Sequence, residues 1–314
     1  MPSWISTGLL ILMIIVVSCA TVRSDVTLPL LDPLEVKGNL RVAGSATVVP
    51  LIRRMYKRFI LEGYRGVMNI RGVGTGRGFK LFCQEGQLDI VLASRPVKGK
   101  EVSACAERGL APVEFVIGVD MLTIVANIEN DFFRGANLVD LKTIFTANRW
   151  SEVNEEWPDD PIERYVPEPG HGSFDFFIDA IFRGDADALL IAANTVKERD
   201  PESIAQSVGS GLNRIGVVGY AFYKKYRENL TTVAIDLVKP SSLAAERGDY
   251  PLTRQLFVYS DSTLIREKEQ VRAFLSFLLN YVSEEIEKVG YFRASQAIIN
   301  NSKLVFLDAM GIEP

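Results

Sequence analysis

The sequence predicts an α/β fold of two lobes joined by two crossover strands. A strand, a short polar loop and a helix follow one another three times between residues 39 and 108, which is typical of a parallel sheet with helices on its faces. Two extended segments, 113–127 and 250–260, are longer than an ordinary strand. They are expected to carry the chain into a second α/β lobe and back, with a cleft between the lobes. The expected division is lobe 1 at 37–119 and 256–314, and lobe 2 at 120–255.

The spacing of apolar side chains places the elements of lobe 1. Residues 48–61 carry apolar side chains at helical spacing, with four basic residues on the opposite face. Ser45 or Thr47 is the expected N-cap of this helix, and its basic face is interpreted as solvent-exposed. The expected strands are 39–43, 67–71 and 88–93, and the expected helices are 48–61, 79–84, 101–108, 271–290 and 294–301.

Lobe 2 shows fewer periodic segments. Residues 138–145 and 172–182 are expected to be helical, and the apolar run RIGVVGY at 214–220 predicts a buried strand. Residues 155–160 contain two acidic pairs next to prolines. We expect a solvated loop there and no metal site.

Charge and composition exclude some functions. The chain has 314 residues, with 35 Lys and Arg against 39 Asp and Glu, and a net charge of −4. A general nucleic-acid binder would carry a basic excess, so no nucleic-acid partner is expected. A small anionic ligand remains compatible, because its site needs only a local positive potential. Neither a G-x-G-x-x-G fingerprint nor a P-loop occurs, and no cofactor is expected.

The N-terminal segment predicts export. Residues 8–20 form an apolar run shorter than the roughly 20 residues that a membrane-spanning helix needs, and its length suits a secretory signal peptide. The run ends in Val-Val-Ser-Cys, similar to a bacterial lipobox. This predicts a signal peptide at 1–18, acylation of Cys19 and a tether at 19–36. Residues 1–7 contain no Lys or Arg, so an uncleaved anchor or a plain signal peptide is the alternative. In each case we expect the body of the protein to lie outside the cytoplasm, and acylation of Cys19 would anchor it to the membrane.

The two other cysteines, Cys83 and Cys105, are expected to form a disulfide. Outside the cytoplasm, a pair of cysteines is more often a disulfide than a metal site. No histidine lies near either cysteine in the sequence, and two thiolates alone are a poor zinc site. Two separate buried thiols are the alternative.

Three loops combine glycine with small hydroxyl side chains directly before a helix. A helix N-terminus presents unpaired N–H groups and a partial positive charge, and glycine lets the backbone approach bound oxygens closely. The loops follow strands, at the edge where open α/β sheets bind ligands, so together they predict an oxyanion site. The alternative for each loop is ordinary helix capping. The candidate ligands are Ser45, Thr47, Thr75, Gly76, His171, Gly172 and Ser173.

Arg95 follows the buried strand at 88–93 and is a further candidate ligand. A guanidinium group donates two parallel hydrogen bonds in a geometry that suits phosphate. The alternative for Arg95 is an ion pair at the protein surface.

Six segments carry a resemblance to a known family. In chain order, between residues 40 and 291, they are AGSATVVPL, GVGTGRGFKLFC, LDIVLASRPVKGKE, GSFDFF, IGVVGYAFY and YPLTRQLFVY. They resemble the PstS family of phosphate-binding proteins, and within it the SphX-like branch. The resemblance implies a type 2 periplasmic binding protein fold that closes on phosphate like a hinge and delivers it to an ABC permease. We expect a monomer.

The chain departs from the family pattern at a position that governs selectivity. In some members the position of Arg95 is an aspartate, which accepts a hydrogen bond from protonated phosphate and so rejects sulfate. Arginine has no acceptor. Selectivity for phosphate therefore requires another carboxylate to reach the ligand, such as Asp120 or Asp175.

Two more departures concern charge at the fourth contact loop. An arginine that often precedes this loop is replaced by Pro167, with Arg164 out of register, and Arg77 is a candidate for the missing charge. His171 stands where the family has serine. If its imidazole contacts the anion, affinity should rise in acid; otherwise it is a neutral hydrogen-bonding substitute for serine.

Three other functions fit the sequence less well. One is binding of another tetrahedral oxyanion such as sulfate, and a second is a surface sensor or adhesion module on the same fold. The third is a secreted hydrolase with Ser173 as nucleophile and His171 as base. These two residues are too close in the chain for a good triad, and no orienting carboxylate is evident.

Overall fold

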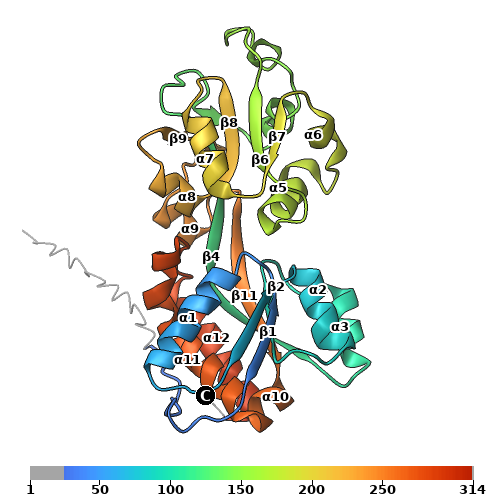
Figure 1. Ribbon diagram of the computed structural model, residues 1–314, viewed down its shortest axis with the longest axis vertical. Helices are drawn as coiled ribbons and strands as arrows, with labels where there is room; N and C mark the ends of the chain where they lie inside the picture. The colour runs from blue at the N-terminus through green and yellow to red at the C-terminus, as the bar shows by residue number, and fades with distance from the viewer. Residues whose placement is uncertain (1–24, 313–314) are drawn as a thin grey trace, which may run out of the picture.

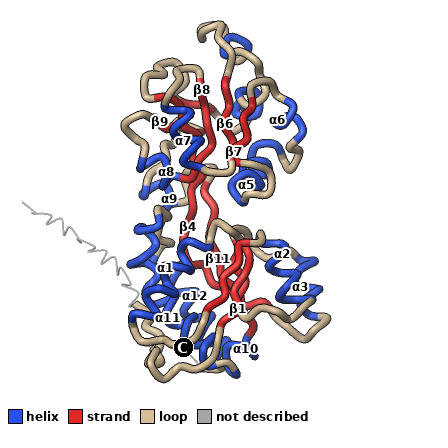
Figure 2. Tube along the Cα trace, in the orientation of Figure 1, coloured by secondary structure: helices blue, strands red, loops and turns tan. Residues whose placement is uncertain are grey.

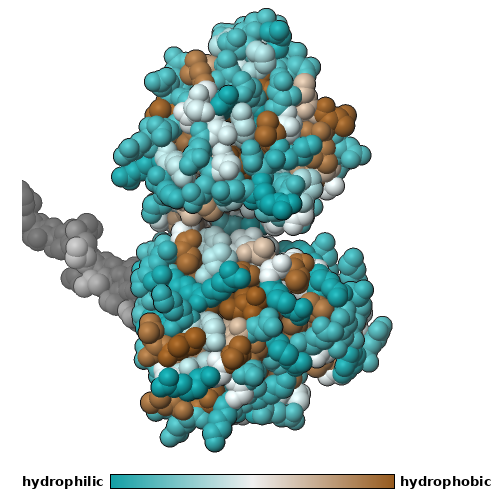
Figure 3. All heavy atoms as spheres, viewed as in Figure 1, coloured by the Kyte–Doolittle hydropathy of each residue, from teal (hydrophilic) through white to brown (hydrophobic). Residues whose placement is uncertain are grey.

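The computed structural model describes residues 25–312 and shows two lobes stacked along the long axis (Figure 1). The long strands β4 (Pro112–Asn127) and β11 (Thr253–Asp261) pass from one lobe to the other as an antiparallel pair (Figure 2). The space-filling view shows a narrow waist between two rounded lobes (Figure 3). The predicted two-lobed α/β fold with two crossover strands is confirmed.

Lobe 1 has three parallel strands beside the crossover pair, in the order β2-β1-β3-β11-β4. The strands are β1 (Leu40–Gly44), β2 (Met68–Gly72) and β3 (Ile90–Ala93). The helices are α1 (Val49–Leu61), α2 (Thr75–Phe79), α3 (Gly99–Ala106), α10 (Ser262–Glu267), α11 (Glu269–Glu285) and α12 (Gln296–Met310), with a π-helical turn η1 (Lys80–Gln84) and a 3-10 turn η3 (Ile286–Val289).

Lobe 2 extends the sheet from the far half of β4, in the order β4-β8-β6-β7, with β9 also paired to β4. The small strands β5 and β10 pair separately. The strands are β5 (Gly135–Ala136), β6 (Glu163–Pro167), β7 (Thr195–Glu198), β8 (Arg214–Gly219), β9 (Leu230–Thr232) and β10 (Ala234–Ile235). The helices are α4 (Asp140–Ile144), η2 (Trp150–Glu152), α5 (Gly172–Phe182), α6 (Asp187–Ile191), α7 (Pro201–Gly209), α8 (Tyr220–Lys225) and α9 (Ser242–Arg247).

Each lobe has helices on both faces of its sheet. In lobe 1, α1, α11 and α12 cover one face and α2 and α3 the other (Figure 1). The apolar stripe of α1 lies against α11, where the ring centres of Phe59 and Phe277 are 4.9 Å apart. The Phe59 ring also stacks on Tyr64, just after α1, at 4.6 Å. In lobe 2, α5 places Phe177 4.8 Å from Phe145. Burying each such side chain stabilises the fold by about 1.5–3 kcal/mol.

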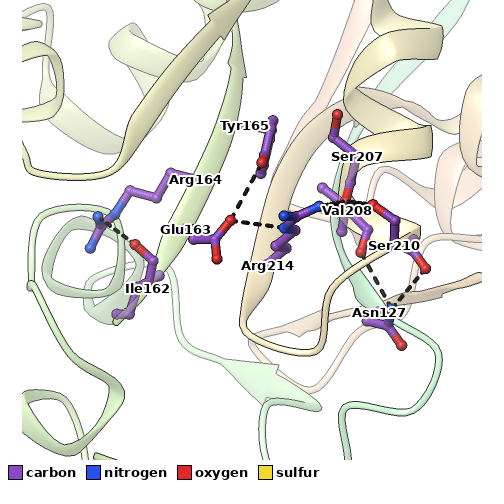
Figure 4. A network of polar contacts seen from close by, with 10 residues as sticks. Asn127, Ile162, Glu163, Arg164, Tyr165, Ser207, Val208, Ser210 and Arg214 are labelled. Atoms are coloured by element: carbon purple, nitrogen blue, oxygen red, sulfur yellow. Dashed lines mark hydrogen bonds and ion pairs between the residues drawn. The ribbon is translucent and has the colours of Figure 1, made fainter. Parts of the chain in front are cut away.

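A polar network fixes the strands of lobe 2 at the end away from lobe 1. Successive side chains of β6 point to opposite sides of the sheet (Figure 4). Glu163 accepts a hydrogen bond from Arg214 Nε at 2.8 Å, which joins β6 to β8. Arg164 points the other way and donates to the carbonyls of Ile162 and Ala193 at 3.2 and 2.7 Å. The network therefore holds β6 in place. The loop before α5 follows directly from the end of this strand.

The segment predicted as a tether packs on lobe 1 from Val26 onward. Leu28 is 1% exposed and exchanges two hydrogen bonds with the Asn280 side chain. Lys303 Nζ donates to the Val26 carbonyl at 2.7 Å. The expectation of an unpacked tether up to residue 36 is thus corrected, because its apolar side chains reach the groove beside α11 and α12. Residues 1–24, with the predicted signal peptide and Cys19, lie outside the described residues.

Cys83 in η1 and Cys105 in α3 form a disulfide in the structure. Both residues are buried beneath the face of the lobe 1 sheet that α2 and α3 cover. A link across 22 residues stabilises a fold by about 3 kcal/mol, because it restricts the unfolded chain. Within residues 25–312, no helix is long and apolar enough to cross a bilayer.

Candidate anion site between the lobes

A pocket of about 300 Å³ lies between the two lobes, beside the crossover strands. Lobe 1 contributes the loop before α1, and lobe 2 contributes the loop before α5 and the end of β8. Asp120 of β4 lines it from the crossover pair. The polar and glycine residues that line it are Thr47, Asp120, His171, Gly172, Ser173, Glu198, Arg199, Gly219 and Tyr291.

The loop before α1 is anchored on the neighbouring strand by its backbone. Gly44 has a φ of +146°, and a Cβ there would lie 2.0 Å from the Leu92 carbonyl oxygen, so glycine is required. The next amide, Ser45 N–H, donates to that carbonyl at 2.8 Å. The N-cap of α1 is Val48, which makes no side-chain cap hydrogen bond. The expected capping by Ser45 or Thr47 is therefore wrong.

The two hydroxyl groups of this loop make tertiary contacts instead. Ser45 Oγ–H donates to Ser94 Oγ at 3.0 Å, and the Ser94 amide donates to Thr75 Oγ1 at 3.3 Å. Three loops at the ends of β1, β2 and β3 are thus linked through one chain of small polar groups. Ser94, which the sequence did not single out, is its middle member. Thr47 lies at the other side of the loop and lines the pocket.

Arg254 joins the two lobes behind the pocket, where it contacts three of the lining residues. Its Nη2 donates to Thr47 Oγ1 of lobe 1 at 3.0 Å, and its Nη1 donates to the Gly172 carbonyl of lobe 2 at 2.7 Å. Nη2 and Nε also donate to Asp120 Oδ2 at 2.7 and 3.0 Å. The guanidinium lies 5.0 Å from the centre of the Phe176 ring. Arg254 is therefore a buried, fixed positive charge where the two lobes meet.

The start of α5 brings backbone amides to the pocket. His171 takes the N-cap position in an extended conformation, and the helix runs for 11 residues from Gly172. The N–H groups of its first turn have no acceptor within the helix, and its dipole adds positive potential. Burial and the Asp179 carboxylate raise the pKa of Asp175 in this turn, against the opposing charges of Arg254 and His171. Gly172 and Ser173 line the pocket directly.

Arg95, which was predicted to contact the ligand, does not line the interlobe pocket and forms an ion pair instead. Its guanidinium donates to both carboxylate oxygens of Glu101, at 2.7 and 2.9 Å. Burial would raise the pKa of Glu101, but the hydrogen bonds from Arg95 and the Lys98 amide outweigh it and lower the pKa. Arg95 and Gly76 line a separate depression of about 490 Å³ on lobe 1, with several lysines. The alternative of an ion pair is what the structure shows.

The other basic residues considered from the sequence do not reach the pocket. Arg77 donates to Glu85 at 2.7 Å at the surface of lobe 1. Arg164 is fully buried among backbone carbonyls, and this burial lowers its pKa to about 10. Pro167 lines the pocket without a charge. Two other arginines, both missed by sequence reasoning, bring positive charge to this region. Arg199 lines the pocket and donates to Glu168 at 2.9 Å. Arg254 lies behind the lining, bonded to Thr47, Asp120 and Gly172, although its segment, YPLTRQLFVY, was recognised as a crossover strand.

The predicted ligands thus divide into three groups. Thr47, His171, Gly172 and Ser173 line the pocket. Ser45 and Thr75 belong to the hydroxyl chain behind it, and Gly76 and Arg95 lie in the separate depression. Within the part of the chain that the structure describes, no three His, Cys, Asp or Glu residues gather in a way that would hold a metal ion. The donors at the pocket are amides, hydroxyl groups and a guanidinium, which suit an oxyanion.

Comparison with known proteins points to one family. A family model described as PBP superfamily domain matches residues 34–281. Protein SphX of Synechocystis is 34% identical over 286 residues, which is 87% of this chain and 84% of that protein. The phosphate-binding protein PstS of Staphylococcus epidermidis is 30% identical over 267 residues, or 83% of this chain and 80% of that protein. A possible phosphate-binding protein from Planctomyces limnophilus superposes with a TM-score of 0.74 at 29% identity, covering 88% of this chain and 99% of that one.

Proposed function

Because the chain belongs to the PBP superfamily, and within it to the family of SphX and the phosphate-binding proteins PstS, we propose that it captures inorganic phosphate for an ABC importer. The ligand lies in the pocket between the lobes. It is bound there by helix N-terminal amides, hydroxyl groups and the positive charge of Arg254. The protein is a binding protein and performs no chemistry on its ligand.

The observation that carries this proposal is the contact of Arg254 with loops of both lobes. The guanidinium donates to Thr47 of lobe 1 and to Gly172 of lobe 2. A multiply charged anion in the pocket is attracted by this charge and by the α5 N-terminus, at a place that both lobes share. Binding there favours the approach of the lobes, which gives an importer a way to distinguish loaded from empty protein.

The remaining parts of the proposal concern location and partners. Export by the signal peptide at 1–18 and acylation of Cys19 would attach the protein to the outer side of a membrane. A disulfide between Cys83 and Cys105 suits an oxidising compartment. There the protein would act as a monomer and dock on the permease of an ABC importer.

Calorimetric titration tests the ligand. The purified protein is titrated with phosphate, sulfate and arsenate at two pH values. We expect one site per chain that binds phosphate and arsenate and discriminates against sulfate. Absence of heat and of thermal stabilisation with phosphate would overturn the proposal. Tighter binding of sulfate than of phosphate would contradict phosphate as the ligand.

A further inference from the structure

Residues 290–292 connect the two lobes beside the crossover strands. The segment follows η3 of lobe 1 and ends in Phe292, which forms an antiparallel bridge with Val119 of β4. The amide of each residue donates to the carbonyl of the other, at 2.9 and 2.8 Å. Phe292 is buried in the apolar core of lobe 2, where its ring centre lies 5.0 Å from that of Tyr220. A segment that follows a lobe 1 helix is therefore attached to lobe 2.

A close backbone contact attaches the same segment to α8 of lobe 2. Gly290 ends η3 with a φ of +87°, and a Cβ there would lie 2.1 Å from the Ala221 Cβ. An added methyl group would have to push α8 away from η3. Ala221 and Val289 both line the pocket, so this movement would separate two of its walls. Glycine at 290 thus lets the lobes approach at the edge of the pocket.

Tyr291, between these two contacts, holds the loop before α1. Its hydroxyl group donates to the Thr47 carbonyl at 2.6 Å. The Thr47 hydroxyl group accepts a hydrogen bond from Arg254, so Thr47 is held through both its backbone and its side chain. Thr47 and Tyr291 both line the pocket. One loop of the pocket therefore depends on a tyrosine whose two neighbours in the chain are fixed to lobe 2.

We propose that residues 290–292 form an interlobe clasp, which limits the separation of the lobes and, given the proposed function, positions Thr47 for phosphate. Gly290 and Phe292 attach the clasp to lobe 2, and Tyr291 attaches it to a pocket loop of lobe 1. A larger fraction of the ligand-free protein then has a complete pocket, which raises the apparent affinity. Tyr291 is a positioning residue, because it acts on the ligand through Thr47.

Two matched glycine variants test the clasp. Gly290→Ala places a methyl group against Ala221, whereas Gly248→Ala, at the end of α9, places one where nothing lies within 4 Å. Both glycines have a positive φ, +87° and +71°, so the variants share the backbone strain and differ in the contact with α8. Small-angle X-ray scattering of the full chain without ligand reports the separation of the lobes. Calorimetric titration with inorganic phosphate reports the affinity.

We expect Gly290→Ala to increase the radius of gyration of the ligand-free protein relative to the wild type and to Gly248→Ala. The dissociation constant for phosphate should rise at least about tenfold in Gly290→Ala, because a smaller fraction of the protein has its lobes together. Equal radii of the two ligand-free glycine variants would overturn the clasp. A wild type that does not bind phosphate would contradict the proposed function, and the radii of the ligand-free proteins would still test the clasp.

A tyrosine variant keeps the proposal testable if Gly290→Ala does not fold. Tyr291→Phe removes only the hydroxyl group that holds Thr47. It should weaken phosphate binding about fivefold, comparable to the loss of one hydrogen bond, and leave the ligand-free radius of gyration unchanged. Tyr281→Phe is the matched control, since Tyr281 lies on α11 with its ring against Phe277, and it should bind phosphate like the wild type. Equal affinities of the two tyrosine variants would refute the positioning of Thr47 by Tyr291.

Discussion

Asp120 and Arg254 are directly opposite each other on the two strands that connect the lobes. Their Cα atoms are paired in the β4–β11 ladder, and Arg254 Nη2 lies 2.7 Å from Asp120 Oδ2. Each side chain is 5% exposed. Because the pair stands at the crossing between lobes, the guanidinium reaches a loop of each lobe without leaving its strand. The pair therefore fixes a buried positive charge directly behind the lining of the pocket.

Removing Arg254 should abolish phosphate binding and weaken the fold. Arg254→Ala leaves Asp120 buried and unpaired, so we expect the free energy of unfolding to fall by about 3–5 kcal/mol. The double variant Arg254→Met, Asp120→Leu removes both charges and should regain most of this stability. It should still not bind phosphate. Urea denaturation and calorimetry measure the two effects, and wild-type affinity in either variant would exclude Arg254 from the site.

Removing Arg95 should have little effect on phosphate binding. Arg95 pairs with Glu101 in the separate depression, and a partly exposed ion pair contributes little. Arg95→Ala is expected to change the dissociation constant for phosphate by less than about fivefold. A loss of tenfold or more in a calorimetric titration would show that Arg95 leaves Glu101 and reaches the ligand.

Adding one methyl group at Gly172 should hinder the approach of the lobes. A Cβ at this position would lie 2.9 Å from Thr47 Oγ1, which is too close for the present contact. Gly172→Ala should weaken phosphate binding roughly tenfold, comparable to the loss of one hydrogen bond, with little change in stability. Gly99→Ala is the matched control, since nothing lies within 4 Å of a Cβ there. Equal affinities of the two variants would argue against lobe contact through Gly172.

The carboxylate of Asp89 should make the stability of lobe 1 depend on pH in the acid range. Burial would raise the pKa of Asp89, but hydrogen bonds from Arg41 and Lys268 outweigh it and hold the pKa below its ordinary value of 3.8. The carboxylate therefore stabilises the folded state above that pH, and this contribution is lost as the pH falls through the lowered pKa.

We expect Asp89→Asn to lower the free energy of unfolding by about 1.5–3 kcal/mol at pH 7. The difference from the wild type should persist down to about pH 4 and shrink below it. Asp159→Asn, at an exposed ion pair with Arg149, should change stability by less than about 0.5 kcal/mol. A difference that grows in acid would contradict the assignment.

Elements with a strong apolar pattern could be predicted from the sequence. The helix expected at 172–182 coincides with α5, and the crossover expected at 113–127 begins one residue earlier as β4. The edge strand β7 was missed because its residues, TVKE, show no buried alternation. The last helix was expected to end at 301 but runs to Met310, because the polar Ser302 is buried and bonds the Val116 backbone.

The loops of the site could be predicted from the residues around them in the sequence. The side chains that contact these loops from distant parts of the chain could not. Gly172, Ser173 and Thr47 were found because each stands beside a helix start. Arg254 was missed since its role depends on pairing with Asp120, which lies 134 residues away in the chain. Arg95 was predicted to bind the ligand because sequence reasoning did not pair it with Glu101, six residues further along the chain. In the structure the Glu101 carboxylate binds the guanidinium group.

Anomalous diffraction from crystals grown with arsenate tests most directly whether the pocket between the lobes is the anion site. Arsenate has the shape and protonation of phosphate, and arsenic gives a signal that locates it. The predicted peak lies between the lobes, within hydrogen-bond distance of the start of α5. A peak in the depression around Arg95, or anywhere outside the interlobe pocket, would contradict the account.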